Sequence, residues 1–300
     1  MPYLRSIVLK VTLVYVIVIV LCASARPATQ SRTIRIAVLD FTNESTGRQA
    51  AQSLREQLSR VDGILIVDRD AAKAAATGIG YAGSLNLSLE ESRDLGAAIG
   101  CDFFVVGVGQ TLRRSPSTGA PYFDSFASIF LVSARSGRLV LWQKSAAREA
   151  SAAAAEQTML TQLKHPGIVA ALIEATETAL SGEATERAER VEKGTPIIEI
   201  MSDNSAGAGD ETRPPRPFRR LKPEYPSNAA EYEVEAVVDV LVDVDDKGEL
   251  GRVEISRWAG YGLDQSVIRT VRQLHFFPAM RDGRAIPMRV LLRYNFRKPQ

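Results

Sequence analysis

Two segments near the carboxyl end of the chain alternate between apolar and polar residues with a period of two. In residues 233–244 the even positions are apolar and most odd positions are acidic, with Val237 and Leu241 as exceptions. In residues 289–296 the even positions are again apolar and the odd positions are polar, apart from Leu291. This pattern predicts two strands of an antiparallel sheet, each with one face on a core and one face in water.

The polar faces of these two strands carry opposite charges. The first is acidic and the second is basic, so neighbouring strands would bring Glu235 or Asp239 opposite Arg289 or Arg293. Each such exposed pair contributes about 0.2–1 kcal/mol. We therefore predict that the two strands are direct neighbours in the sheet.

The residues between these strands predict a turn, a second strand and a helix. The turn is expected at residues 245–248, and Asp264 lies in the first helical turn, where the helix dipole favours a negative charge. One helix face is apolar, at Leu263, Val267, Val271 and Leu274. Phe276, Phe277 and Pro278 are expected to end the helix and to close the apolar face of the sheet. The expected unit is a small α+β domain, a three-stranded antiparallel sheet packed on one helix.

The first half of the chain alternates between buried strands and amphipathic helices. Strands are expected at residues 34–41, 64–67, 103–108, 126–133 and 139–144. Helices are expected near residues 50–58, 71–76 and 88–99, the last with a capping box formed by Ser88 and Glu91. This order predicts an α/β domain, a mixed sheet with flanking helices that is partly parallel and ends in an antiparallel hairpin at one edge.

A helical region and a linker are expected to separate the two domains. Residues 146–190 are rich in Ala, Glu, Gln and Leu and favour helix, with a break or kink at residues 165–167. Residues 201–217 contain Asn, Ser, Gly, Asp and three prolines and are expected to be the linker. The predicted domains are therefore residues 33–200 and residues 218–300.

The amino terminus, residues 1–25, predicts export. Its apolar run follows Arg5 and Lys10 and ends in a small-x-small pattern. The residues that define this segment are Val11, Leu13, Val16, Val18, Val20, Ala23 and Ala25. A cleaved signal peptide and an uncleaved membrane anchor both fit, because fifteen helical residues span roughly 22 Å of a hydrocarbon core about 30 Å thick. In both cases the rest of the chain faces the periplasmic side of the cell envelope, either anchored in the inner membrane or secreted.

Composition excludes several classes of function. The chain has 300 residues, is 45% hydrophobic and carries a formal charge of +2, so it lacks the concentrated basic face of a nucleic-acid-binding protein. It has two cysteines and two histidines, with no spacing typical of metal ligands or of a nucleophile. We predict a protein that is not an enzyme and that has no metal, cofactor or small-molecule substrate.

The carboxyl-terminal pattern closely resembles the C-terminal domain of TonB-family proteins. The resemblance is carried by Pro223-Glu224-Tyr225-Pro226, the alternating strand, the turn, Gly262-Leu263-Asp264, Phe276-Phe277-Pro278-Ala279 and the closing Tyr294-Asn295-Phe296. The first half resembles the periplasmic domain of CsgG-like and TolB amino-terminal proteins. That resemblance rests on residues 36–41, 67–69, 100–102, 106–107 and the hairpin 132–137 leading to Trp142.

The TonB resemblance implies a binding site for an extended segment of another protein. In that family one sheet edge stays open, and a segment of an outer-membrane receptor adds to it as a further strand. The edge implied here is the closing strand, Arg289, Val290, Leu291, Leu292, Arg293, Tyr294, Asn295 and Phe296. Family members that transmit proton-motive force also contact inner-membrane motor proteins, but the apolar run here has no histidine and the linker is short.

Two functional hypotheses follow. The first is an exported TonB-family protein of the cell envelope that binds a partner by β-strand addition and supports TonB-dependent transport. The second is a periplasmic assembly or scaffold protein without an energy-transducing role, in which the TonB-like domain serves docking or oligomerisation.

Overall fold

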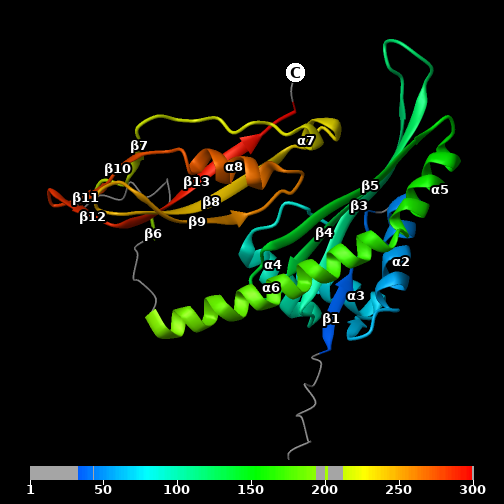
Figure 1. Ribbon diagram of the computed structural model, residues 1–300, viewed down its shortest axis with the longest axis horizontal. Coiled ribbons are helices and arrows are strands. Elements are labelled where there is room, and N and C mark those ends of the chain that lie inside the picture. Colours follow the sequence, from blue (N-terminus) through cyan, green and yellow to red (C-terminus); the bar gives the residue numbers. More distant parts are fainter. Residues whose placement is uncertain (1–32, 43, 194–199, 202–211, 299–300) are drawn as a thin grey trace, which may run out of the picture. The chain divides into compact units, whose positions relative to one another are not determined.

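The computed structural model describes residues 33–42, 44–193, 200–201 and 212–298. The first half is built on a five-stranded sheet with the order β2-β1-β3-β4-β5 (Figure 1). Its strands are β1 (Ile34–Val38), β2 (Ile64–Ile66), β3 (Phe103–Arg114), β4 (Tyr122–Ser133) and β5 (Leu139–Glu149). β2, β1 and β3 are parallel, whereas β3, β4 and β5 are antiparallel. The predicted mixed sheet with an antiparallel edge is confirmed.

The two faces of this sheet are covered differently. The helices are α2 (Ser45–Leu58), α3 (Arg69–Gly78), α4 (Leu89–Ile99), α5 (Ala152–Leu163) and α6 (Pro166–Lys193). On one face, Ile36, Val105 and Ile129 form a core with α2, α5 and α6. On the other face, Ala37 and Phe104 pack with α3 and α4. Successive strand residues point to opposite faces, so the continuous apolar runs of β1, β3 and β4 supply both cores.

Local signals place several helix ends. Ser88 Oγ accepts a hydrogen bond from the N–H of Glu91 at 3.1 Å, and the Glu91 carboxylate accepts one from the N–H of Ser88 at 2.6 Å. The capping box is therefore confirmed. The break at residues 165–167 is confirmed too, since α5 ends at Leu163 and α6 begins with Pro166, where a missing N–H is tolerated.

The prediction of helix from residue 146 is wrong. β5 continues to Glu149, with Ala146 opposite Phe126 and Glu149 opposite Phe123 of β4. The alanines here favour helix only by their intrinsic propensity, a weak preference that pairing along β4 overrides. Helix begins after Ser151, whose hydroxyl accepts a hydrogen bond from the N–H of Ala154.

The carboxyl-terminal part has a second sheet with the order β6-β13-β8-β9, packed on helix α8 (Leu263–Val271). Its strands are β6 (Ile200–Met201), β8 (Ala236–Val244), β9 (Leu250–Arg257) and β13 (Met288–Phe296). β8, β9 and β13 are antiparallel as predicted, and β6 adds two residues in parallel to β13. β8 starts at Ala236 rather than at residue 233, because Glu233 has a left-handed backbone conformation with φ of 49°.

Short elements complete this part. They are α7 (Ser227–Glu231) and the strands β7 (Arg216–Pro217), β10 (Phe276–Phe277), β11 (Ala279–Arg281) and β12 (Arg284–Ile286). Phe276 is buried, but the prediction for Phe277 is wrong, since Phe277 is 59% exposed and its ring lies 4.2 Å from that of Phe218. β10 pairs with β7, so its two side chains point to opposite faces and only Phe276 reaches the core.

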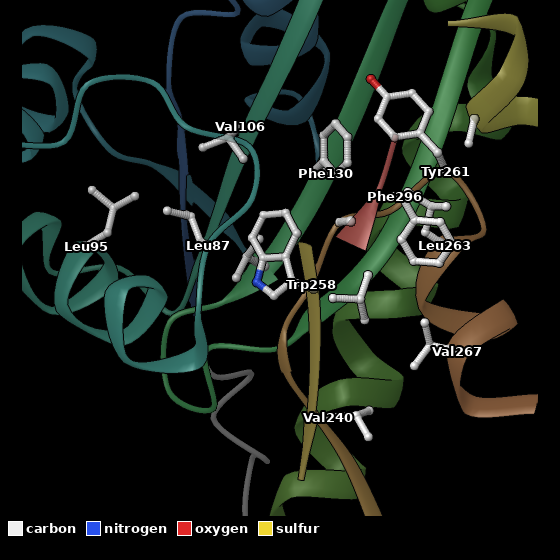
Figure 2. Close-up of a cluster of buried hydrophobic side chains, with 14 of the residues drawn as sticks. Leu87, Leu95, Val106, Phe130, Val240, Trp258, Tyr261, Leu263, Val267 and Phe296 are labelled. Carbon is white, nitrogen blue, oxygen red and sulfur yellow. The ribbon is translucent and has the colours of Figure 1, made fainter. Parts of the chain in front are cut away.

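One hydrophobic cluster joins the two parts of the chain. Phe130 lies on the part of the first sheet that α3 and α4 do not cover, and it packs against Trp258 and Tyr261. Val240 and Val267 of the carboxyl-terminal part belong to the same cluster. Figure 2 shows Trp258 with Phe130 and Leu87 beside it. The carboxyl-terminal part therefore covers a sheet face that α3 and α4 leave open.

The predicted export segment, residues 1–25, lies outside the described residues. Within the part of the chain that the structure covers, no helix is both long enough and apolar enough to cross a membrane.

Candidate partner-binding groove

Strand β13 has one paired edge and one edge that is largely open. All nine of its residues pair with β8, from Met288 opposite Val244 to Phe296 opposite Ala236. On the other side β6 pairs only with Arg289 and Val290. From residue 291 to residue 296, the described chain places no strand on the outer edge. Alternate residues of such an edge present N–H and C=O groups outward.

A groove of about 1040 Å³ runs along this open edge. One wall is β13, Leu274 contributes to the lining, and the other wall is formed within residues 212–223. The lining residues are Thr212, Pro214, Pro215, Arg216, Pro217, Arg220, Leu221, Lys222, Pro223, Leu274, Val290, Leu291, Leu292, Arg293, Tyr294, Asn295 and Phe296. The structure thus places seven of the eight predicted edge residues on one groove and leaves Arg289 beside β6.

The wall opposite β13 is hydrogen-bonded to the segment that contains His275, β10 and Met280. Arg213 and Met280 exchange two backbone hydrogen bonds of 2.7 and 2.9 Å. β7 then pairs with β10, and the N–H of Phe218 donates to the carbonyl of His275 at 2.8 Å. The end of the segment expected to be a linker is therefore ordered, and it forms the side of the groove.

Two arginines of β13 bind carboxylates of β8, as the charge pattern predicted. Arg293 donates to both carboxylate oxygens of Asp239 at 2.7 and 2.9 Å, and Arg289 donates to Asp243, with its Nη2 at 2.8 Å. These hydrogen bonds raise the pKa of both guanidinium groups above the ordinary value. The strand adjacency and the Asp239–Arg293 pair are confirmed, whereas Arg289 takes Asp243 because the register places it there.

Tyr294 is the aromatic residue with a polar group on the groove wall of β13. Burial raises the pKa of its hydroxyl above the ordinary value. The hydroxyl therefore stays neutral around physiological pH, able to donate or accept a hydrogen bond to a bound segment.

Asn86, from the loop before α4, fastens the second sheet to the first half of the chain. Its Nδ2 donates to the carbonyls of Val237 at 2.8 Å and Trp258 at 2.6 Å, and its Oδ1 accepts from the N–H of Val237 at 3.0 Å. The carbonyl of Asn86 accepts from Arg257 at 2.7 Å, and Ser88 forms a β-bridge with Arg257. The loop therefore continues the hydrogen bonding of the second sheet at the end of β9.

Trp258 is the central side chain of the contact between the two parts. It is 1% exposed, and its Nε1 donates to Ser92 Oγ and to the carbonyl of Gly137, both at 3.2 Å. Its ring lies 5.9 Å from that of Phe130. A buried indole N–H needs such partners, so these contacts fix the orientation of Trp258.

A tight corner follows Trp258. Gly260 has φ of 73°, and a Cβ there would lie 2.4 Å from a ring carbon of Phe130, so only glycine fits. Asp264 accepts hydrogen bonds from the N–H groups of Ala259 at 2.9 Å and Gly260 at 2.8 Å. Burial outweighs these bonds and raises the pKa of Asp264 to about 6. The corner places Tyr261 in the shared cluster, where its ring centroid lies 5.5 Å from that of Phe130.

Ion pairs surround this apolar contact. Arg138 binds Glu254 at 2.6 Å, while Lys144 and Arg148 bind Glu231 at 2.7 and 2.8 Å. Each pair joins the β5 region to the carboxyl-terminal part. The contact thus has apolar side chains at its centre and ion pairs beside them.

Sequence reasoning missed these junction residues. The signal for Trp258 and Tyr261 is present, since an aromatic-rich segment with Gly260 and Gly262 between a strand and a helix is typical of a tight corner. Asn86 gives no such signal, because its partners lie 151 and 172 residues further along the chain.

His165 and Cys101 each contact a backbone group of a nearby residue. His165 Nδ1 accepts from the N–H of Gly167, and burial raises the pKa of the half-buried Cys101 to about 12. Within the residues described, no group of three His, Cys, Asp or Glu side chains is arranged to hold a metal ion.

Comparison with known proteins gives a family match for the carboxyl-terminal part. Residues 222–297 match the family model described as Gram-negative bacterial TonB protein C-terminal. No curated protein matches the chain. The resemblance of residues 33–200 to CsgG-like and TolB amino-terminal proteins stays a prediction.

Several solved structures are similar at low identity. The TonB C-terminal domain of Pseudomonas aeruginosa is 19% identical, with 33% of this chain and 95% of that chain covered and a TM-score of 0.26. A hypothetical protein of Chlamydia trachomatis is 11% identical, with 48% and 98% covered and a TM-score of 0.35. A lipoprotein of Neisseria meningitidis is 14% identical, with 50% and 99% covered and a TM-score of 0.30. At these scores the structural likeness carries no argument for function.

Proposed function

We propose that this chain is an exported TonB-family protein of the cell envelope that captures an extended segment of a partner protein. The segment adds to the outer edge of β13 at residues 291–296, beyond the two residues that β6 covers. The partner class that the TonB resemblance implies is an outer-membrane receptor with an extended periplasmic segment.

The observation that carries this proposal is the open edge of β13 along one wall of a formed groove. A strand rises about 3.3 Å per residue, so six edge residues accommodate roughly 20 Å of an added strand. Each backbone hydrogen bond contributes about 0.5–1.5 kcal/mol, which supports a specific but reversible contact. The opposite wall, within residues 212–223, offers side-chain contacts to the segment.

The test uses hydrogen exchange on the full chain. Synthetic peptides with the sequences of periplasmic amino-terminal segments of outer-membrane receptors from the same genome serve as probes. We expect a binding peptide to slow amide exchange at residues 291–296 of β13. The edge of β9, at residues 250–256, belongs to the same sheet and is the internal control, with unchanged exchange.

A peptide control separates strand addition from other binding. Methylating alternate backbone nitrogens of the peptide removes ladder N–H groups without altering the protein, and two such peptides cover both registers. Strand addition predicts that one of the two loses binding. Equal binding of the parent and both methylated peptides, or protection confined to β9, would overturn the proposal.

A scaffold protein without energy transduction is the second candidate, and the shared hydrophobic cluster favours it. The TonB-like part packs on the first half through Trp258 and Asn86. Fractionation of expressing cells separates the candidates. An intact Met1 terminus in the inner membrane supports transduction, whereas a mature terminus at Arg26 in the soluble periplasm supports the scaffold.

A further inference from the structure

The groove along β13 has a strongly one-sided charge. Its lining contains four cationic side chains, Arg216, Arg220, Lys222 and Arg293, and no Asp or Glu. Arg293 is already bound by Asp239 on the neighbouring strand. Arg216, Arg220 and Lys222 are exposed and form no ion pair with any residue of the described chain. Three cations therefore remain available on the wall opposite β13.

The backbone that carries these cations is held in place. Arg216 lies in β7 and pairs with Phe277 of β10. Pro223 is buried and Leu221 is half-buried, which anchors the stretch that contains Arg220 and Lys222. A wall already fixed before binding loses little conformational entropy when a ligand arrives. Its charges therefore contribute more to the binding free energy than the same charges on a free linker.

The same wall offers few backbone N–H groups to a further strand. Pro214, Pro215, Pro217 and Pro223 line it and have no backbone N–H. We expect a bound segment to form its ladder on β13, with its polar side chains close to the cationic wall. β13 thus supplies the backbone hydrogen bonds, and the opposite wall selects the side chains of the bound segment.

From this division we propose that the groove selects an acidic extended segment of a partner protein, recognised by Arg216, Arg220 and Lys222. The inference rests on strand addition at β13, as proposed above. A protein segment fits better than an anionic membrane surface, because a lipid headgroup cannot complete the row of N–H and C=O groups along β13.

The test compares two nine-residue synthetic peptides on the full chain. Valine alternates with glutamate in the first, and glutamine replaces every glutamate in the second. We expect the acidic peptide to bind about three- to thirtyfold more tightly at low salt, since three exposed ion pairs act together. Added salt should reduce this difference, because exposed charges are screened.

Matched variants locate the effect. The variant Arg216→Gln, Arg220→Gln, Lys222→Gln is expected to remove most of the preference for the acidic peptide. The control Arg269→Gln, Arg272→Gln, Arg284→Gln removes the same charge from exposed positions outside the groove lining and should keep the preference.

The possible outcomes are distinct. Equal binding of both peptides, with slowed exchange at residues 291–296, overturns the acidic preference but leaves strand addition intact. Binding of neither peptide, together with failure of the receptor peptides, overturns strand addition itself. If the chain binds vesicles containing phosphatidylglycerol through the three cations and does not bind the acidic peptide, the wall is a membrane-binding surface and the inference is wrong.

Discussion

Single side chains set the geometry of the junction between the two parts. Asn86 forms three hydrogen bonds to backbone groups of β8 and the β9–α8 corner, so its amide acts as a substitute for a strand residue. Asp264 holds the corner at Ala259 and Gly260 from the first turn of α8. Both residues bind backbone rather than other side chains, which fixes the path of the chain itself.

Asp264 makes stability dependent on pH. Burial raises its pKa in the folded chain to about 6, above the ordinary value of 3.8. A raised pKa means that the fold favours the protonated form, so this stabilising contribution is full below 3.8 and is lost as pH rises through about 6. The free energy of unfolding should fall over this window by roughly 2–3 kcal/mol relative to Asp264→Asn, which does not titrate.

Urea unfolding of the parent chain and of the Asp264→Asn variant, from about pH 4 to about pH 7, measures how the difference between their unfolding free energies changes with pH. Comparing the two chains cancels the contributions of the other acids, including Asp40, whose pKa is lowered mainly by its hydrogen bond with Arg69. A gap between the two unfolding free energies that stays constant with pH contradicts the prediction.

At the scale of the element, β13 is held in place by charges as well as by its ladder. Asp239 is 5% exposed and accepts two hydrogen bonds from Arg293, and Arg257 lies 3.6 Å away. Arg293 itself is mostly exposed. The pair thus joins a buried carboxylate to a cation that lies on the groove.

A double-mutant cycle measures this pair. We expect Asp239→Asn to destabilise the chain more than Arg293→Gln, because the first leaves two arginines beside a neutral amide and the second leaves Asp239 with Arg257. The coupling free energy between the two positions should be about 1 kcal/mol. Additive effects of the two substitutions on the free energy of unfolding contradict the prediction.

The elements also show what the sequence can predict. Period-two alternation placed β8 and β13 and their opposite charges correctly, because both features follow from one strand face lying on a core. The end of β5 and the exposure of Phe277 depend on which strand pairs with each segment. The local sequence does not indicate that neighbouring strand. The short pairing of β6 with β13 is missed for the same reason.

At the scale of the whole molecule, the described parts share one hydrophobic cluster. Sequence reasoning placed a linker between two separate domains, and nothing in either half indicates that Phe130 and Trp258 meet. Apolar residues on a sheet face predict burial but do not identify the covering element. Of the open groove, only the edge strand could be predicted, because residues 212–217 of the opposite wall lie in the segment expected to be the linker.

The shared cluster predicts that the two halves unfold together. Trp258→Ala should lower the free energy of unfolding by about 3–5 kcal/mol and speed amide exchange in β4 as much as in β8. Phe277→Ala, an exposed aromatic in the same part of the chain, is the matched control and should change little. Faster exchange in β8 with β4 unchanged would show that the halves unfold independently.

The bonds of Asn86 bear on how the molecule responds to mechanical force. A partner segment on β13 that is pulled along the strand direction loads the nine residue pairs with β8 in shear, so their hydrogen bonds must stretch together. β8 passes that load to Asn86 at Val237, one residue inside the strand. Tension on a captured segment would therefore reach the first half of the chain through the hydrogen bonds of the Asn86 amide.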